Sequence, residues 1–583
     1  MKFTALGGAN EVGASCSLLQ VAGRNILVDA GVRVNRRGDD SLPDLARLHQ
    51  ISGGRIDLIL VTHAHTDHIG ALPLVHGRYG AAPILTTVPT KKITAILLQD
   101  SVRIMNSEER EEEPLFDEQA VRSLLWKIDT VPFHEWIEPL PGIRVRWHPA
   151  GHIVGAGCIL METPEGRVLF SGDISSANQR TVAGINPIDE FQPDLLILES
   201  TYGDGIHASR KTEEQRLAQA VGEVIRGGGS VLFPSFALGR AQEIILILKS
   251  CIASGLIPKF PIYVDGMVRS VCDVFTELID YLPTELRNWA RNARQPIFWQ
   301  RGAKHLPTVQ RLSAEDRPLV LTGQPKVVVA SSGMLIGGPS VRYARFFAPR
   351  EDCAIFLTGY QDEESPGRRL LGLKTGDTWR FPDGEEVTMA CRVQKYNLSA
   401  HADQVQLCQF ASWVKPSAVV LVHGESHAIQ TLRSKLVLKH IVWTPSNGQT
   451  FDPLSKPDWL SDYRKQQLDV EFERFTGRVE PGEDGRVRIS FDPPLGETEP
   501  WRQFFAGYPR IEAKFQGRRL IIKGVSEEEE AADAAAGVPA ADRENGAGPE
   551  GADEVPWPRP GGIANPGAVA VPPLDETPAS ADH

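Results

Sequence analysis

One six-residue stretch decides the fold of this chain: His63-Ala64-His65-Thr66-Asp67-His68. It comes directly after residues 56–62, an apolar run that predicts a buried strand. In an extended segment, residues two apart point the same way, so His63 and His65 can bind the same metal ion. Once the chain turns, Asp67 and His68 can reach a second ion. Four ligand-type side chains so close together are costly to desolvate without a cation, so the stretch predicts a metal centre.

Ligand-type side chains follow three other apolar runs. His152, Asp173 and His423 each come after a β-type run and have a glycine neighbour, which allows the backbone to approach closely. Each one alone is more typical of a turn or of a hydrogen-bonded core histidine. Together with the six-residue stretch they complete a site for two metal ions. Nitrogen and oxygen ligands without sulfur favour two zinc ions, with manganese as a substitute.

The pattern of strands and helices changes along the chain. Up to about residue 203, short apolar runs end in polar turns, whereas strands alternate with helices in the next part, which predicts a parallel α/β sheet. The pattern predicts early strands at 25–31, 56–62, 142–147, 167–173 and 194–199, later strands at 230–234, 261–265, 326–330 and 353–358, and helices at 212–225 and 240–249.

The α/β part is interpreted as an insertion, because motif residues that belong with the first domain resume at Asn397. The expected organisation is the first domain at 1–203 and 386–451, the inserted domain at 204–385, a small β-rich region of unknown role at 452–524 and an acidic tail at 525–583. The tail has 13 acidic and 2 basic residues, so it carries almost all of the net charge of −12. It has few large apolar residues, so we expect it to be disordered.

Composition narrows the class of protein. Because the acidity lies in the tail, it does not argue against a nucleic-acid partner for the rest of the chain. The seven cysteines are scattered, and none forms a Cys-x-x-Cys pair, which is typical of reduced thiols in a cytosolic protein. No apolar stretch has the length of a membrane span or of a secretory signal. We therefore expect a cytoplasmic protein with no membrane partner.

The metal-ligand pattern, taken with Asp29, resembles the signature of the metallo-β-lactamase superfamily. Further blocks resemble the β-CASP nucleases of that superfamily, and they lie at 198–203, 234–243, 330–339 and 398–404. The resemblance covers about residues 1–450 and is greatest to bacterial and archaeal relatives of the endonuclease subunit of the pre-mRNA cleavage and polyadenylation machinery. It implies an αββα sandwich with an inserted parallel α/β domain.

The resemblance also implies a role for each site residue. In such proteins Asp29 orients the ligands, His401 protonates the leaving oxygen, and Glu199 holds His401 in position. The implied reaction is hydrolysis of RNA phosphodiester bonds to a 5′-phosphate and a 3′-hydroxyl, with water activated by two metal ions. The implied ligands are His63, His65 and His152 for one zinc, Asp67, His68 and His423 for the other, and Asp173 between them.

Single-stranded RNA is the expected substrate, because the DNA-repair branch of the superfamily usually lacks a histidine at the position of His423. Two alternatives stay open. A small-molecule hydrolase of the same superfamily would not need the inserted domain, Glu199 or His401. A catalytically silent scaffold of a processing complex would usually have lost metal ligands. The sequence does not separate an endonuclease from a 5′→3′ exonuclease, and it leaves the oligomeric state open, a homodimer being one option.

Two features of the inserted domain have more than one interpretation. The turn Ser331-Ser332-Gly333 follows a buried strand, so its hydroxyl and N–H groups could bind a substrate phosphate. An ordinary turn from a strand to a helix explains the same residues equally well. Arg240 follows Gly239 at an expected helix start, and it could face a cleft or be solvated.

Overall fold

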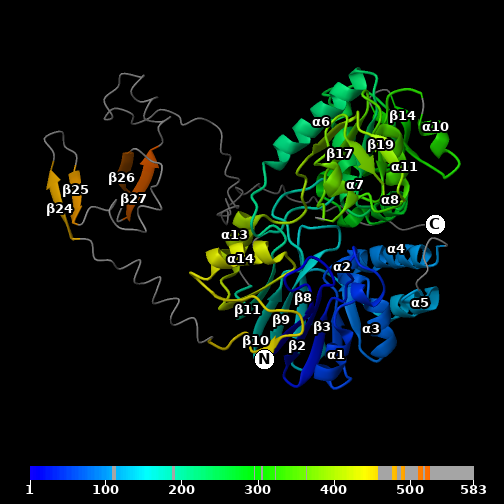
Figure 1. Cartoon of the computed structure of the whole chain (residues 1–583). Helices are drawn as coiled ribbons and strands as arrows, with labels where there is room; N and C mark the ends of the chain where they lie inside the picture. Colours follow the sequence, from blue (N-terminus) through cyan, green and yellow to red (C-terminus); the bar gives the residue numbers. More distant parts are fainter. Residues whose placement is uncertain are drawn as a thin grey trace, which may run out of the picture. The chain divides into compact units, whose positions relative to one another are not determined.

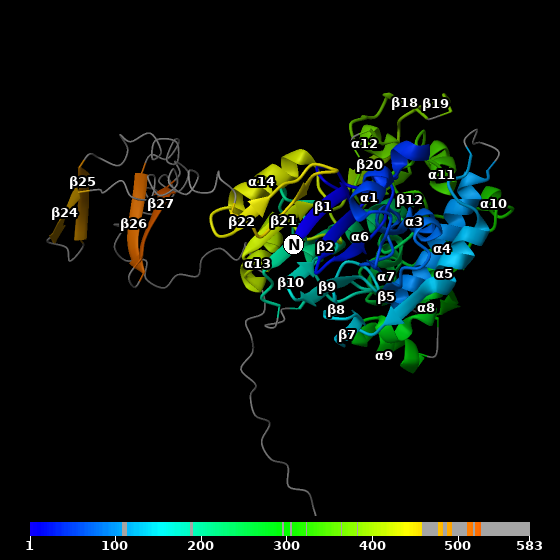
Figure 2. The same cartoon turned by 90° about the horizontal axis from the view of Figure 1, so that it is seen from below.

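Three seven-stranded sheets form the framework of the first part of the chain (Figures 1 and 2). The chain divides into two units, Met1–Glu471 and Phe472–His583, which are described separately. The computed structural model describes residues 1–107, 113–186, 191–293, 296–303, 306–321, 323–362, 364–381 and 383–456, and four strands between 476 and 525.

The first sheet combines an antiparallel half and a parallel half. Its strands, in spatial order, are β23 (Thr450–Phe451), β1 (Lys2–Gly7), β2 (Cys16–Val21), β3 (Arg24–Val28), β4 (Leu58–Leu60), β5 (Ile84–Thr87) and β6 (Ile128–Val131). Strands β23 to β3 are antiparallel, and β3 to β6 are parallel. Helices α1 (Leu45–Ser52), α4 (Val88–Met105) and α5 (Glu118–Lys127) contact this sheet. The short helices α2 (Thr66–Ile69) and α3 (Leu72–Arg78) follow β4.

The second sheet also has seven strands. In spatial order they are β22 (Ile441–Trp443), β21 (Ala418–Val422), β11 (Leu195–Glu199), β10 (Gly166–Phe170), β9 (Gly157–Thr163), β8 (Ile143–Pro149) and β7 (Ile137–Leu140). Helix α14 (Ser426–Leu436) packs on β21 and β22, and α13 (Gln404–Val414) packs on α14.

The two sheets face each other across one apolar core. Alternate side chains of the strands enter it, such as Leu58 and Leu60 from β4 and Val168 and Phe170 from β10. Trp147 of β8 is fully buried there. With helices on the outer faces, this arrangement confirms the predicted αββα sandwich. Strands β10, β11 and β21 are parallel neighbours, so the residues at their carboxyl ends meet at one edge of the sandwich.

The third sheet forms the core of the inserted domain. Its order is β14 (Gln300–Ala303), β15 (Leu306–Arg311), β13 (Ile262–Asp265), β16 (Val327–Ala330), β12 (Val231–Pro234), β17 (Ala354–Leu357) and β20 (Arg392–Lys395). All neighbours are parallel except β14 and β15, which confirms the predicted parallel α/β sheet. Strand β20 lies beyond residue 385, where the sequence suggested the end of the insertion.

Helices cover both faces of the third sheet (Figure 1). Helices α6 (Arg210–Arg226), α7 (Arg240–Ala253) and α8 (Val268–Glu277) contact one another on one face. Helix α11 (Pro339–Phe347) packs with Leu232, Val328 and Ile355 in a separate core. The remaining elements are η1 (Gly38–Ser41), η2 (Ile279–Tyr281), α9 (Thr284–Ala293), α10 (Arg317–Leu321), α12 (Pro366–Leu370) and the hairpin β18 (Thr378–Arg380) and β19 (Glu386–Thr388).

The second unit contains two antiparallel hairpins among its described residues. Strand β24 (Thr476–Pro481) pairs with β25 (Val487–Asp492), and β26 (Arg510–Gln516) pairs with β27 (Arg519–Val525). The acidic tail beyond residue 525, which we expect to be disordered, lies outside the described residues. Within the described part of the chain, no helix combines the length and the apolar character needed to cross a membrane.

Candidate metal centre and active-site cleft

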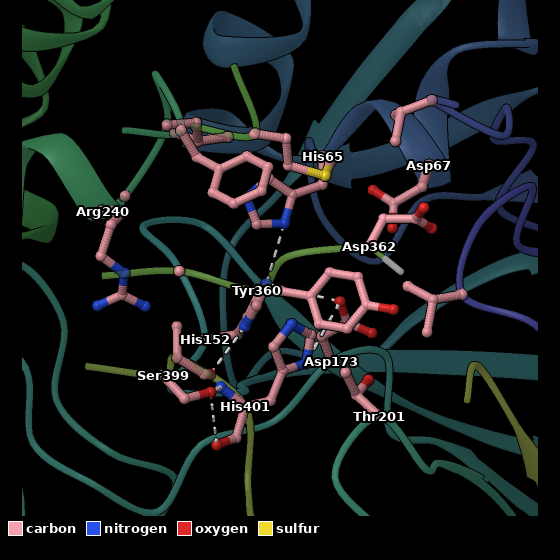
Figure 3. A pocket seen from close by; sticks show the side chains of 18 of the residues that line it. His65, Asp67, His152, Asp173, Thr201, Arg240, Tyr360, Asp362, Ser399 and His401 are labelled. Carbon is pink, nitrogen blue, oxygen red and sulfur yellow. Dashed lines mark hydrogen bonds and ion pairs between the residues drawn. The ribbon is translucent and has the colours of Figure 1, made fainter. Parts of the chain in front are cut away.

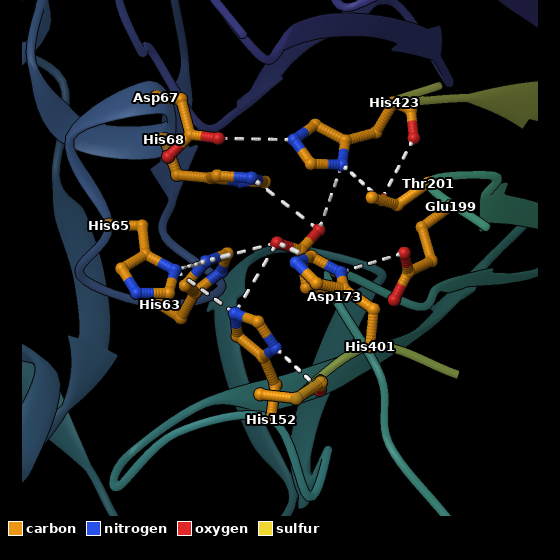
Figure 4. Close-up of polar contacts among 12 residues, drawn as sticks. His63, His65, Asp67, His68, His152, Asp173, Glu199, Thr201, His401 and His423 are labelled. Carbon is orange, nitrogen blue, oxygen red and sulfur yellow. Dashed lines mark hydrogen bonds and ion pairs between the residues drawn. The ribbon is translucent and has the colours of Figure 1, made fainter. Parts of the chain in front are cut away.

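The first group of possible metal ligands surrounds the end of β4. His63 comes three residues after that strand, His65 caps the start of α2, and His152 lies in the turn between β8 and β9. His65 Nδ1 is 3.2 Å from His63 Nε2 and 3.0 Å from His152 Nε2. With a carboxylate oxygen of Asp173, one ligand atom from each residue lies within 4.8 Å of the others. These four side chains can therefore bind one cation (Figure 4).

A second group lies on the other side of Asp173. Asp67 and His68 belong to α2, and His423 follows β21. His423 Nε2 is 3.2 Å from Asp67 Oδ2, and ligand atoms of the three residues lie within 4.8 Å of one another. The structure thus brings together residues that are about 350 positions apart in the sequence, because β21 returns beside β11.

Asp173 lies between the two groups (Figure 4). Its Oδ2 is 3.4 Å from His63 Nε2 and 3.5 Å from His152 Nε2, and its Oδ1 is 3.5 Å from His68 Nε2 and 3.4 Å from His423 Nδ1. The side chain is buried, yet neither oxygen has a hydrogen-bond partner among the described residues. A buried carboxylate in this state is costly unless a cation satisfies it, so the residues fit a pair of divalent metal ions.

The pKa shifts point the same way. Burial and neighbouring histidines lower the pKa of His63 and of His152, so both rings are neutral, as metal ligands must be. Burial disfavours the charged form of His68, but Asp173, Asp29 and Asp67 outweigh burial and raise the pKa of His68 to about 10. The carboxylates around His68 therefore favour positive charge at this position.

Asp29, which follows β3, contacts residues that follow β4. Its Oδ2 is 2.8 Å from His68 Nδ1 and accepts a hydrogen bond of 2.7 Å from Thr62 Oγ1, and its Oδ1 accepts one of 2.8 Å from Thr62 N. Thr62 Oγ1 is also 3.1 Å from His63 Nδ1. Asp29 therefore contacts His68 directly and His63 through Thr62, and both rings turn their Nε2 atoms toward Asp173.

Glu199 and His401 form a pair beside the metal ligands. Glu199 is the last residue of β11, and its Oε1 accepts a hydrogen bond of 2.6 Å from Ile174 N. His401 lies between β20 and α13, and its Nδ1 is 3.0 Å from Glu199 Oε2 and 3.9 Å from Asp173 Oδ2. Burial opposes the charged form of His401, but Glu199 and Asp173 outweigh it and raise its pKa to about 9. The ring is therefore an imidazolium at neutral pH, as a general acid must be.

The ligands lie at the bottom of a cleft with a volume of about 190 Å³ (Figure 3). Residues of the inserted domain, among them Phe236, Arg240 and Tyr360, form its other wall. Hydrogen bonds between side chains join the two domains beside this cleft. Asn35 Nδ2 donates to Asp362 Oδ2 at 3.1 Å, and Tyr360 Oη donates to Glu425 Oε1 at 2.5 Å.

The turn Ser331-Ser332-Gly333 does not line this cleft, although the next residue, Met334, does. Its groups are used locally. Ser332 Oγ donates to Gly337 O at 3.2 Å, and Gly333 O accepts a hydrogen bond of 3.1 Å from Gln361 Nε2. These contacts give the turn a structural role beside Met334, and a role of the turn in phosphate binding stays a prediction.

Sequence reasoning missed the role of Thr201. Its hydroxyl is 3.1 Å from His423 Nδ1 and 3.2 Å from His423 O, so it holds this ligand in place. A signal was present, because Thr201 lies two residues after Glu199 in the block at 198–203. Its partner is more than 200 residues away, so no local pattern predicts the contact.

Three family models match the chain in succession. The metallo-beta-lactamase superfamily matches residues 9–234, the Beta-Casp domain matches residues 241–370, and the Zn-dependent metallo-hydrolase RNA specificity domain matches residues 386–444. Their order follows the three parts of the fold that meet at the cleft.

Curated proteins of several organisms are similar over most of this length. The chain is 30% identical over 465 residues to Integrator complex subunit 11 of Gallus gallus, covering 78% of this chain and 74% of that protein. It is 29% identical over 452 residues to an RNase J-like protein of Methanocaldococcus jannaschii, covering 77% and 97%. It is 32% identical over 450 residues to Endoribonuclease YSH1 of Candida glabrata, covering 75% and 56%.

Proposed function

Because the chain belongs to the metallo-β-lactamase superfamily and carries its β-CASP domain, we propose that it is a zinc-dependent ribonuclease acting on single-stranded RNA. The observation that carries this proposal is the buried Asp173 carboxylate. Its two oxygens face two separate groups of ligands, and it lies beside the Glu199–His401 pair. The named ribonucleases among the relatives support RNA hydrolysis as the reaction.

Each group of ligands has its place in the proposed site. Nitrogen and oxygen donors without a thiolate suit zinc, with manganese as a substitute. Asp29 and Thr201 position the rings of His68 and His423. In the proposal His63, His65 and His152 would hold one ion, Asp67, His68 and His423 would hold the other, and Asp173 lies within reach of both groups.

Two bound divalent ions would supply water of lowered pKa as the nucleophile and would neutralise charge on the phosphate. His401 has its Nδ1 toward Glu199, so its Nε2 carries the proton that the leaving oxygen needs. Glu199 fixes the ring and keeps it protonated. In the proposal the leaving group is the 3′-oxygen, so the P–O3′ bond breaks and the products are a 5′-phosphate and a 3′-hydroxyl.

The two alternatives account for less of the structure. A small-molecule hydrolase does not explain why the inserted domain forms a whole wall of the cleft or why Glu199 and His401 are paired. A silent scaffold does not explain why all seven expected ligands lie within reach of two cations.

The seven free thiols suit a reducing compartment, so we propose a cytoplasmic location. The homodimer stays a prediction.

Cleavage of a 5′-labelled single-stranded RNA tests the function. We expect the zinc-loaded protein to cut it, a chelator to abolish cutting, and His401→Ala to reduce the rate by roughly 10²- to 10⁴-fold while both zinc ions stay bound. A ladder of internal products would identify an endonuclease. Release of the labelled mononucleotide from the 5′ end would identify a 5′→3′ exonuclease. A protein that holds two zinc ions but cuts no RNA would contradict the proposal.

A further inference from the structure

Arg240 is a buried cation without a partner. It is the first residue of α7, it lines the cleft, and only 7% of its surface is exposed. Its Nη1 is buried and has no hydrogen-bond partner, and no hydrogen bond or ion pair to its guanidinium group is found among the described residues. The structure thus decides between the two sequence-based interpretations, because Arg240 faces the cleft. A buried and unpaired charge is costly, so its presence calls for an anion.

The carboxylate of Glu243 does not satisfy Arg240. Glu243, one turn further along α7, is fully buried and is already occupied by the N–H groups of Arg180 and Thr181, at 2.8 and 2.7 Å. It also accepts a hydrogen bond of 2.6 Å from Arg210 Nη2. Burial and Arg210 lower the pKa of Arg240 to about 10, so its guanidinium still carries a charge at neutral pH. Positive charge is therefore in excess at this end of the helix.

Two further features of the cleft suit an anion that accepts hydrogen bonds. The N-terminus of α7, whose dipole favours anions, is the end of the helix from which Arg240 reaches the cleft. The hydroxyl of Thr358 lines the same cleft, is buried, and has no hydrogen-bond partner among the described residues. A phosphate oxygen is an acceptor that suits both groups, and a guanidinium can donate to two of its oxygens at once.

The position of Arg240 relates it to the cut bond. Gly239 has φ of 83° and lies so close to Ile153, the neighbour of His152, that a Cβ there would be 3.1 Å from Ile153 Cγ2. Tyr202, which is close enough to Arg240 to interact with it electrostatically, has its ring 6.1 Å from that of His401. In Figure 3 the guanidinium lies on one side of the cleft, and Asp67 and Asp362 lie on the other. Arg240 thus lies on the side of the cleft that carries Tyr202 and Ile153, apart from Asp67 of the second group of ligands.

We propose that Arg240, with the Thr358 hydroxyl and the N-terminal end of α7, binds a backbone phosphate of the RNA adjacent to the phosphate that is cut. This inference rests on the proposed function of the cleft. It makes Arg240 a substrate-binding residue that fixes the register of the RNA strand over the metal centre. A substrate with a single phosphodiester cannot occupy both positions, so it does not use Arg240.

The test compares two substrates and three variants in the zinc-loaded full chain. Arg240→Met removes the charge and keeps a similar length, Arg240→Lys keeps the charge without the two-pronged donor, and Arg122→Met removes an exposed arginine of α5 as a control. For RNA we expect KM to rise roughly 10- to 100-fold in Arg240→Met, less in Arg240→Lys, and not in Arg122→Met. Hydrolysis of bis(p-nitrophenyl) phosphate, which has one phosphodiester, should be unchanged in all three.

The salt dependence of RNA binding is a second measurement, and it would not change if Arg240 had only a structural role. RNA binding by proteins that also carry His401→Ala is measured over a range of potassium chloride concentrations. Loss of one phosphate contact should lower the slope of log K against log salt by about 0.7 in Arg240→Met. An unchanged KM and an unchanged slope would overturn the inference, as would equal losses on both substrates, since those indicate a disturbed metal centre.

Two further outcomes separate this inference from a failure of the proposed function and from binding of a terminal phosphate. If the wild-type protein hydrolyses bis(p-nitrophenyl) phosphate but neither binds nor cuts RNA, the proposed function itself fails. The RNA is also compared with a 5′-phosphate and with a 5′-hydroxyl. Equal losses in Arg240→Met on both forms support an internal backbone phosphate. A loss confined to the 5′-phosphorylated form would overturn that assignment in favour of a terminal phosphate.

Discussion

Asp173 is the residue of this site whose buried carboxylate most clearly calls for a bound cation. Histidines surround its two buried oxygens, yet neither oxygen receives a hydrogen bond among the described residues. The local spacing of His63, His65, Asp67 and His68 was enough to predict metal binding from the sequence. The contact between Thr201 and His423 could not be predicted, because it depends on two strands meeting after more than 200 residues.

Asp29→Asn tests the positioning of a ligand at the same scale. Asp29 has φ of 60°, a conformation that asparagine also tolerates, so the substitution removes charge without straining the backbone. We expect zinc affinity or phosphodiesterase activity to fall by about 10- to 100-fold, because His68 loses the acceptor that orients it. Zinc titration with a competing chelator measures the affinity. Asp129→Asn, on an exposed position of β6, serves as the control, and equal affinities in the two variants would contradict this role.

At the scale of elements, α7 joins the inserted domain to the sandwich. Its buried Glu243 accepts hydrogen bonds from the backbone of Arg180 and Thr181 and from the Arg210 side chain. The buried face of this helix therefore takes part in a polar network in which Glu243 and Glu214 both pair with Arg210. Such a network is sensitive to loss of a single partner, because the remaining groups stay buried.

Glu243→Gln should destabilise the protein by about 3–5 kcal/mol, because Arg210 loses its buried carboxylate partner and keeps only Glu214, and because the new amide cannot accept every N–H. Urea unfolding followed by tryptophan fluorescence measures the change. Glu118→Gln, which removes an exposed charge on α5, should leave the midpoint unchanged. Similar midpoints for both variants would show that the Glu243 network contributes little.

Most central elements could be predicted from the sequence, and the edge elements could not. The strand expected at 230–234 is β12 (Val231–Pro234), and the helix expected at 240–249 is α7, which continues to Ala253. These segments have continuous apolar runs because they are buried. Strand β20 has the sequence Arg-Val-Gln-Lys and lies at the edge of its sheet, where its outer residues are solvated. Only pairing with β17 makes it a strand.

At the scale of the whole molecule, metal binding should contribute to folding stability. The expected ligands come from both sheets of the sandwich. Bound ions would therefore link the two sheets and would balance the charge of the buried Asp173 carboxylate. We expect a chelator to lower the melting temperature by roughly 4 °C, since a ligand present far above its Kd stabilises the folded state by about 4 kcal/mol. Differential scanning calorimetry measures the shift. Asp173→Asn should show no shift, and a full shift in that variant would place the bound metal elsewhere.

The division into two units predicts that the hairpins are not needed for the chemistry. A chain ending at Lys456 keeps β23, which pairs with β1, and the hydrogen bond from Trp443 Nε1 to Pro453 O. Its hydrolysis of bis(p-nitrophenyl) phosphate should equal that of the full chain when both are loaded with zinc. Loss of that activity in a folded, truncated protein would show that the second unit contributes to the metal centre.

The insertion lies between β11 and β21, which are neighbours in one sheet, so Glu199 precedes it and both His401 and His423 follow it. This order has a consequence for protein synthesis. A nascent chain that has just completed the inserted domain already contains six of the seven expected ligands, but it lacks the general acid and His423. Under the proposed function, a ribosome-bound chain cannot cut the messenger that encodes it until translation has passed residue 423.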